Sequence, residues 1–199
     1  MRPTVEDLQA IWLFTYSRSS LLDAVNFLKE LDTAAPESLQ YRALIDAAII
    51  AYARSFTTCY LPPKRKRVVP LKGVLPPRHL AEAHKNAMDM RDTMIGHKDA
   101  SPAQGYTATP NIVLVGNFPG KFSLNSTMIG EMYPELKNAL GELCAYFVQY
   151  CDTNLSRLRK LYRSEFDKHP PGQYELVISE PPADWLISFE TKHGEDFRV

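Results

Sequence analysis

The feature that most constrains the fold is a series of apolar residues that recur every three or four positions between residues 134 and 166. This spacing places them on one face of an α-helix, since a helix completes a turn every 3.6 residues. Pro134 and Glu135 suit its first turn. We therefore predict the longest helix here, with Cys144 and Cys151 as small core residues. The apolar series comprises Leu136, Leu140, Leu143, Phe147, Leu155, Leu158 and Leu161.

Three earlier segments have helical periodicity: residues 4–32, residues 36–56 and residues 76–96. Thr4 and Pro36 suit the starts of the first two segments, and Gly96 suits the end of the third. Residues 57–76 contain several prolines and a basic run, which is typical of a connecting loop. In the second segment, the stripe predicted to face the core comprises Leu39, Ile45, Ile49, Tyr52 and Phe56.

Short β-structure is expected on either side of the longest helix. Before it, Ile112–Val115 and Lys121–Leu124 flank a glycine-rich turn, which predicts a hairpin over residues 110–125. After it, apolar residues alternate between Tyr174 and Phe189, which predicts one or two short strands. The chain is therefore expected to be mainly α: an antiparallel four-helix bundle (1–166) with the hairpin inserted, followed by a short β or extended C-terminal tail (167–199).

Composition limits the functional classes. The chain has 23 Lys and Arg and 23 Asp and Glu residues, so nucleic-acid contact requires a local basic patch. Three cysteines without a C-x-x-C motif favour a reducing compartment. No stretch has the length or apolarity of a membrane span, and the start lacks a signal-peptide pattern, so we expect a cytoplasmic protein with no membrane partner. No H-E-x-x-H motif is present, and neither a metal nor another cofactor is predicted.

The stretch from His84 to His97 is chemically unusual. On a helix, His84, Met88, Arg91 and Ile95 share one stripe, so an Arg and a His lie on the face predicted to point inward. Gly96 is expected to end the helix, which lets the His97 ring turn back toward Arg91. A guanidinium binds phosphate oxygens, and a neutral imidazole accepts a proton from a hydroxyl. This pairing favours phosphate chemistry.

Arg91, the polar Asp92 after it and His97 resemble the signature of the HEPN superfamily: an Arg, a polar residue and then a His after four to six intervening residues. The segment from Asp46 to Phe56 is similar to the second helix of HEPN proteins of the abortive-infection and toxin type. The resemblance covers roughly residues 4–166.

The resemblance implies a metal-independent endoribonuclease of toxin or phage-defence type, active as a homodimer and restrained by an antitoxin protein. Arg91, His97 and Asp92 would be its catalytic residues, and RNA its substrate. His84 either lines the same cleft or is simply a hydrogen-bonded histidine on a helix face. Asp46 and Arg54 either flank the site or form a solvated surface pair. The basic run Lys64, Arg65, Lys66 and Arg67 is a candidate contact for the RNA backbone.

Two other hypotheses remain open. In one, a HEPN-like domain no longer cuts RNA and instead binds nucleotide or RNA, or serves in assembly. In the other, the chain is an unrelated helical scaffold in which Arg91 and His97 meet packing or capping demands. The target RNA and its cleavage sequence are not encoded in any motif that we recognise.

Overall fold

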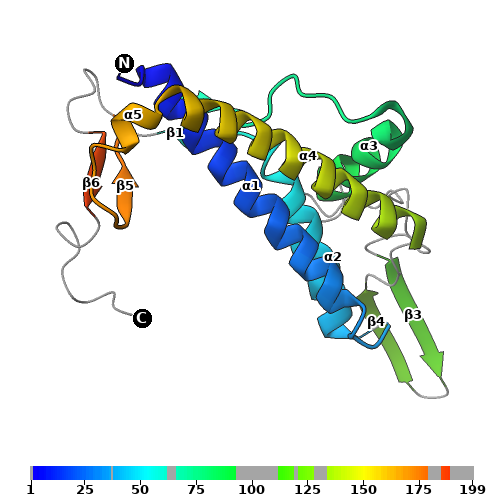
Figure 1. Cartoon of the computed structure of the whole chain (residues 1–199). Coiled ribbons are helices and arrows are strands. Elements are labelled where there is room, and N and C mark those ends of the chain that lie inside the picture. The colour runs from blue at the N-terminus through cyan, green and yellow to red at the C-terminus, as the bar shows by residue number, and fades with distance from the viewer. Residues whose placement is uncertain are drawn as a thin grey trace.

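The computed structural model describes residues 2–36, 38–61, 66–92, 112–118, 121–127, 134–178 and 185–188. This part of the chain is mainly helical, as predicted, and contains three two-stranded antiparallel sheets. The longest helices run side by side, and α3 lies beside α4 (Figure 1). The helices are α1 (Val5–Leu31), α2 (Leu39–Ala53), α3 (Ala81–Met90), α4 (Pro134–Leu161) and the short α5 (Arg163–Phe166), with a 3₁₀ turn, η1 (Arg78–Leu80), before α3.

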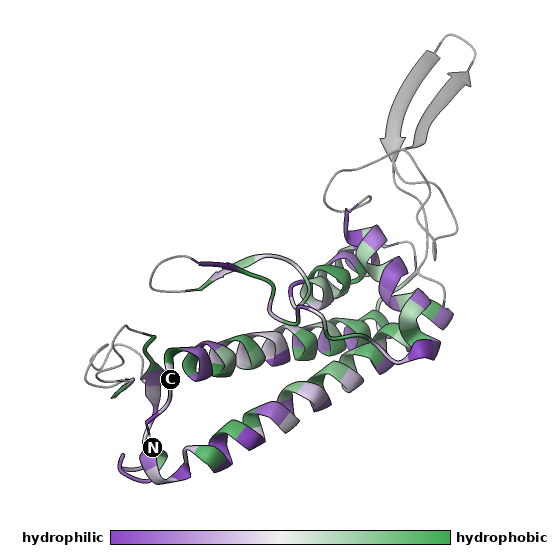
Figure 2. Cartoon of the chain, turned by 90° about the horizontal axis from the view of Figure 1, so that it is seen from above, coloured by the Kyte–Doolittle hydropathy of each residue, from purple (hydrophilic) through white to green (hydrophobic). Residues whose placement is uncertain are grey.

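The main core lies where α4 and α2 pack against α1, with α3 contributing fewer contacts. Most of the apolar series predicted for α4 forms its buried face, and Leu140, Leu143 and Phe147 are fully buried. The prediction is wrong for Leu161, which is 52% exposed because it lies in the last turn of the helix. Hydrophobic and hydrophilic residues alternate along the long helices, as expected of amphipathic helices (Figure 2). The prediction that Cys144 and Cys151 are core residues is confirmed, and burial raises the pKa of their thiols to about 12 and about 11.

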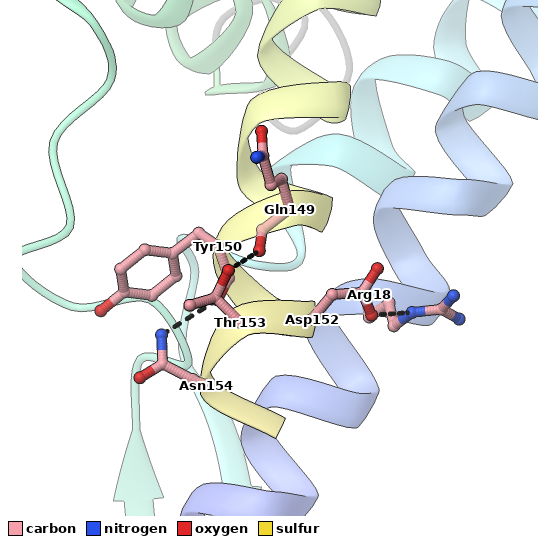
Figure 3. Close-up of polar contacts among 6 residues, drawn as sticks. All are labelled: Arg18, Gln149, Tyr150, Asp152, Thr153 and Asn154. Carbon is pink, nitrogen blue, oxygen red and sulfur yellow. Dashed lines mark hydrogen bonds and ion pairs between the residues drawn. The ribbon is translucent and has the colours of Figure 1, made fainter. Parts of the chain in front are cut away.

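A polar contact joins α1 to α4 at the surface. Arg18 Nε donates to Asp152 Oδ1 at 2.6 Å, and Figure 3 shows the two side chains pointing toward one another. Because both are roughly half-exposed, this pair contributes at most about 1 kcal/mol to stability. Thr153 and Asn154 donate instead to backbone carbonyls one turn earlier in α4 (Figure 3). The alignment of α1 and α4 therefore rests on their apolar faces.

The helix starts depend on capping residues. Thr4 and Asp7 form a reciprocal capping box at the start of α1, as the sequence predicts. The prediction that the second helix begins at Pro36 is wrong. Ser38 is the N-cap, since its side chain accepts a hydrogen bond from the Tyr41 amide, and α2 therefore begins at Leu39. Leu39 consequently lies in the exposed first turn with 81% of its surface accessible, not in the core.

The prediction of an unstructured connection over residues 57–76 is also wrong. β1 (Cys59–Leu61) pairs with β2 (Lys66–Val68), and the register places Tyr60 opposite Arg67. The aromatic and branched residues on either side of the basic run suit strands, and the buried Leu61 anchors the pair.

The hairpin predicted over residues 110–125 is confirmed. It is formed by β3 (Ile112–Phe118) and β4 (Lys121–Thr127). The predicted turn at Gly116–Gly120 is shorter than expected, because Gly116 to Phe118 continue the first strand.

The predicted C-terminal strands are confirmed and pack near the start of α1. β5 (Tyr174–Leu176) pairs with β6 (Leu186–Ser188). Leu8, Ile178 and Trp185 form a second, smaller core, and the Trp185 ring packs edge-on against Phe166 of α5. No helix among the described residues has both the length and the apolarity needed to cross a membrane.

We expect Leu140→Ala to lower the free energy of unfolding by about 2–5 kcal/mol, because it leaves a cavity between α4 and the other helices. Leu161→Ala is the matched control on the same helix, where 52% of the side chain is exposed, and we expect a change of about 0.5 kcal/mol or less. Urea unfolding followed by circular dichroism measures both. Similar losses for the two variants would contradict the packing described.

Candidate active site on α3

Helix α3 follows Pro76 and Pro77 through η1, so the chain turns into the helix at a proline pair. Ala87 and Met90 form its buried face, together with Leu80 from η1. The face predicted to point inward carried His84 and Arg91. In the structure these two residues lie at the edge of the buried face instead, and both are partly exposed.

His84 is held in a cluster of aromatic rings from α2 and α4. Its Nδ1 atom is hydrogen-bonded to the Tyr52 hydroxyl at 2.6 Å. Its ring packs edge-on against Phe56, with ring centres 4.8 Å apart, and lies 6.2 Å from the Phe147 ring. Phe56 and Phe147 also contact each other edge-on. The cluster therefore fixes the orientation of the imidazole.

Burial determines the protonation of this pair. It raises the pKa of Tyr52 far above its ordinary value, so the hydroxyl keeps its proton. It lowers the pKa of His84, so the imidazole is neutral at neutral pH. Because the Tyr52 hydroxyl keeps its proton, it can donate to Nδ1, and in that tautomer the imidazole proton lies on Nε2. His84 is therefore suited to donating a hydrogen bond to an anion.

Arg91 follows the last residue of α3, and its side chain is 40% exposed. Its guanidinium donates to the carboxylate of Asp92, the next residue along the chain. Arg91 comes seven residues after His84, about 10 Å along the helix axis, so the two lie on nearly the same side of α3. The accessible guanidinium can reach an anionic ligand.

Several predicted site residues lie outside the described residues. They include Gly96, which was expected to end the helix, and His97, the predicted general base. Lys64 and Arg65 of the basic run also lie outside them. The position of His97 relative to Arg91 stays a prediction.

Asp46 and Arg54 are not paired with each other in the described part of the chain. Asp46 is partly buried in α2, and burial raises its pKa, while the nearby Arg42 acts in the opposite direction. Arg54 caps the C-terminal end of α2 and is exposed. The described contacts to His84 come from Tyr52 and Phe56 of the same segment, so neither Asp46 nor Arg54 orients that ring.

Lys66 and Arg67 lie in β2 and line a pocket of about 500 Å³ between the β1–β2 hairpin and α1. Lys72, which the sequence did not single out, lines it as well. The sequence therefore identified two of the cations at this pocket and missed the third.

The sequence also did not identify Tyr52 and Phe147 as partners of His84, because both match the apolar periodicity of their helices. One signal was available: a buried tyrosine needs a hydrogen-bond partner, and only a polar side chain on a neighbouring element can supply it.

Among the described residues, no group of three or more His, Cys, Asp or Glu side chains is arranged to hold a metal ion. In comparisons with models of protein families, with curated proteins and with solved structures, the chain has no significant match. The resemblance to HEPN proteins therefore depends on the motif and the order of the helices.

We expect acid to destabilise the protein partly through His84. The unfolded chain takes up a proton near the ordinary pKa of 6.5, whereas the folded protein does so only at lower pH, so stability is lost as the pH falls below 6.5. Substitution His84→Gln should reduce this loss between neutral pH and pH 5, whereas His79→Gln, at an exposed position, should leave it unchanged. Urea unfolding across this pH range measures the effect. Equal pH dependence in all three proteins would show that His84 is not buried as a neutral ring.

Proposed function

We propose that the protein is a metal-independent endoribonuclease of toxin or phage-defence type, with its reacting groups at the C-terminal end of α3. The observation that carries the proposal is the position of Arg91. Its guanidinium is accessible at the end of the helix, its described partner is the adjacent Asp92, and the core does not require it. Such a cation is available to a phosphodiester.

In the proposed reaction, His97 accepts the proton of an RNA 2′-hydroxyl, and the resulting oxyanion attacks the adjacent phosphorus. Arg91 neutralises the charge that grows on the non-bridging oxygens, and Asp92 orients the guanidinium. The bond between phosphorus and the 5′-oxygen breaks, and this oxygen takes up a proton from water. The protonated His97 gives its proton to the resulting hydroxide, which restores the neutral ring. The products are a 2′,3′-cyclic phosphate and a 5′-hydroxyl.

His84 has a supporting part in this proposal. Its Nε2–H donates a hydrogen bond to a phosphate oxygen, and Tyr52 fixes the tautomer that makes this possible. Since burial lowers the pKa of His84, the ring stays neutral and keeps this donor over the neutral pH range. His84 thus binds the substrate, and the proton transfer is left to His97.

In line with the HEPN resemblance, we also propose that the helices form an antiparallel four-helix bundle and that the protein is a homodimer in which two Arg and His motifs share a cleft. The protein would be cytoplasmic, and an antitoxin protein would restrain its activity. Sedimentation of the purified protein tests the dimer independently of activity.

We expect the purified protein to cut RNA in the presence of EDTA and to leave DNA of the same sequence intact, because DNA lacks the 2′-hydroxyl. His97→Ala should abolish cutting, while His79→Ala, which changes an exposed histidine before α3, should not. Gel electrophoresis of the labelled RNA, with detection of the cyclic phosphate end, measures this. If neither the wild type nor any variant cuts RNA, the protein is a binding or assembly domain instead.

Arg91→Ala should lower the cleavage rate by about 100-fold or more, the loss expected when one donor to the developing charge is removed. The free energy of unfolding should change by only about 0.5 kcal/mol, because the side chain is accessible. Arg78→Ala, at an exposed arginine in η1, is the matched control for both measurements. A large loss of stability in Arg91→Ala would assign Arg91 a structural role.

A further inference from the structure

The pocket between the β1–β2 hairpin and α1 is lined by three cationic side chains and by no carboxylate. We propose that it binds the phosphate backbone of a single-stranded RNA. The choice of RNA as the ligand rests on the proposed function. We call this site the hairpin pocket; it is lined by Gln9, Leu13, Thr58, Leu61, Lys66, Arg67, Val68, Val69 and Lys72.

The charge of the residues that line the hairpin pocket is the first observation that supports RNA binding. Lys66, Arg67 and Lys72 all line the hairpin pocket, whereas no Asp or Glu does. Within the described residues none of these three cations forms an ion pair, although Arg18 and Lys137 on the helices both do. Three unneutralised cations around one hollow create a local positive potential, even in a chain with equal numbers of acidic and basic residues.

A second basic pocket provides a comparison. It lies at the end of α4, has a volume of about 420 Å³ and is lined by Arg159, Lys160 and Arg163. Asp167 also lines it and lies 3.7 Å from Arg163. A phosphate bound there would meet a carboxylate, which makes this pocket the weaker anion site.

The non-charged residues fit a nucleotide chain better than a free phosphate ion. Leu13, Val68 and Val69 give the hairpin pocket apolar walls, against which a ribose or a base edge can pack. Tyr60 does not line the hairpin pocket, but it lies opposite Arg67 in the β1–β2 register and is 55% exposed. An exposed aromatic ring beside cations is the combination that single-stranded nucleic acids bind, because the ring stacks on a base while the cations contact phosphates.

The hairpin pocket is linked to the α3 site through the end of α2. The Ser55 carbonyl accepts from the Leu71 amide at 2.9 Å, and Lys72 follows Leu71. On the other side, Ser55 precedes Phe56, whose ring packs against His84. The backbone of the segment around Leu71 is thus fixed to the residue that precedes Phe56, a ring of the His84 cluster.

The test uses a short fluorescein-labelled 2′-O-methyl oligoribonucleotide, which cannot be cut by 2′-hydroxyl attack, and measures binding by fluorescence anisotropy in EDTA. We expect Arg67→Ala and Lys72→Ala each to raise Kd roughly three- to tenfold, with less loss at high salt. Each substitution should reduce the slope of log Kd against log salt concentration by about 0.7, which is the value for one phosphate contact to a single strand. Tyr60→Leu should raise Kd while leaving the salt slope unchanged, because stacking is not ionic.

Arg159→Ala removes one positive charge at the comparison pocket and is the matched control, for which we expect little change in Kd. An equal loss for Arg159→Ala and Lys72→Ala would mean that binding follows total charge, and would overturn the proposal. Unchanged binding in Arg67→Ala and Lys72→Ala would also overturn it. Competition by inorganic phosphate at concentrations comparable to the oligonucleotide would assign the hairpin pocket to a small anion instead.

The two proposals fail separately. Cleavage of unmodified RNA with no effect of the pocket variants on binding would leave the nuclease proposal standing and remove the hairpin pocket. Binding that depends on Lys72 and Arg67 without any cleavage would retain the pocket as an RNA site and remove the catalytic role of Arg91 and His97.

Discussion

The packing of α4 and α2 against α1 is the interaction on which the rest of the described structure depends. Leu140, Leu143 and Phe147 are fully buried and belong to the one hydrophobic cluster that these helices share. Burial of this kind stabilises a fold by roughly 25 cal/mol for each Å² removed from water. The surface ion pair between Arg18 and Asp152 adds little to it. The short strands and α3 are arranged around this helical core.

Phe147 connects this core to the chemistry proposed for α3. Phe147 is buried in the apolar interior, and its ring centre also lies 6.2 Å from that of His84. Tyr52 of α2 also connects the core to the α3 site, since its ring is buried and its hydroxyl is hydrogen-bonded to His84. The imidazole is thus positioned by side chains that the core already holds in place. Catalytic and binding groups benefit from such rigid support, because a group held in one orientation loses little entropy when it meets a ligand.

Elements with strong apolar periodicity were predictable from the sequence. Short strands and the burial of single residues near helix ends were not. The apolar residues of α4 recur over seven turns, and both its start at Pro134 and its buried face were predictable. The β1–β2 pair was missed because each strand has three residues and a basic, proline-containing segment dominates the local pattern. Leu39 was assigned to the core because periodicity does not show where a helix begins.

The candidate site likewise contains residues that the sequence identified and residues that it did not. Arg91 and Asp92 were identified from their spacing in a motif, and the structure places them in contact. The bond between Tyr52 and His84 joins residues 32 positions apart, and it depends on how α2 and α3 meet. Lys72 was overlooked because it is a single cation outside the basic run. Such partners become visible only once the helices and the hairpin are placed in space.

The small core near the start of α1 has a consequence for synthesis on the ribosome. Leu8 packs with Ile178 and Trp185, and Asp7 accepts a hydrogen bond from Tyr162, which lies 155 residues later. The first two turns of α1 are therefore translated long before the residues that cover them. During that interval their apolar side chains stay open to solvent or to a chaperone, and this end of the molecule is completed only after Trp185 has been made.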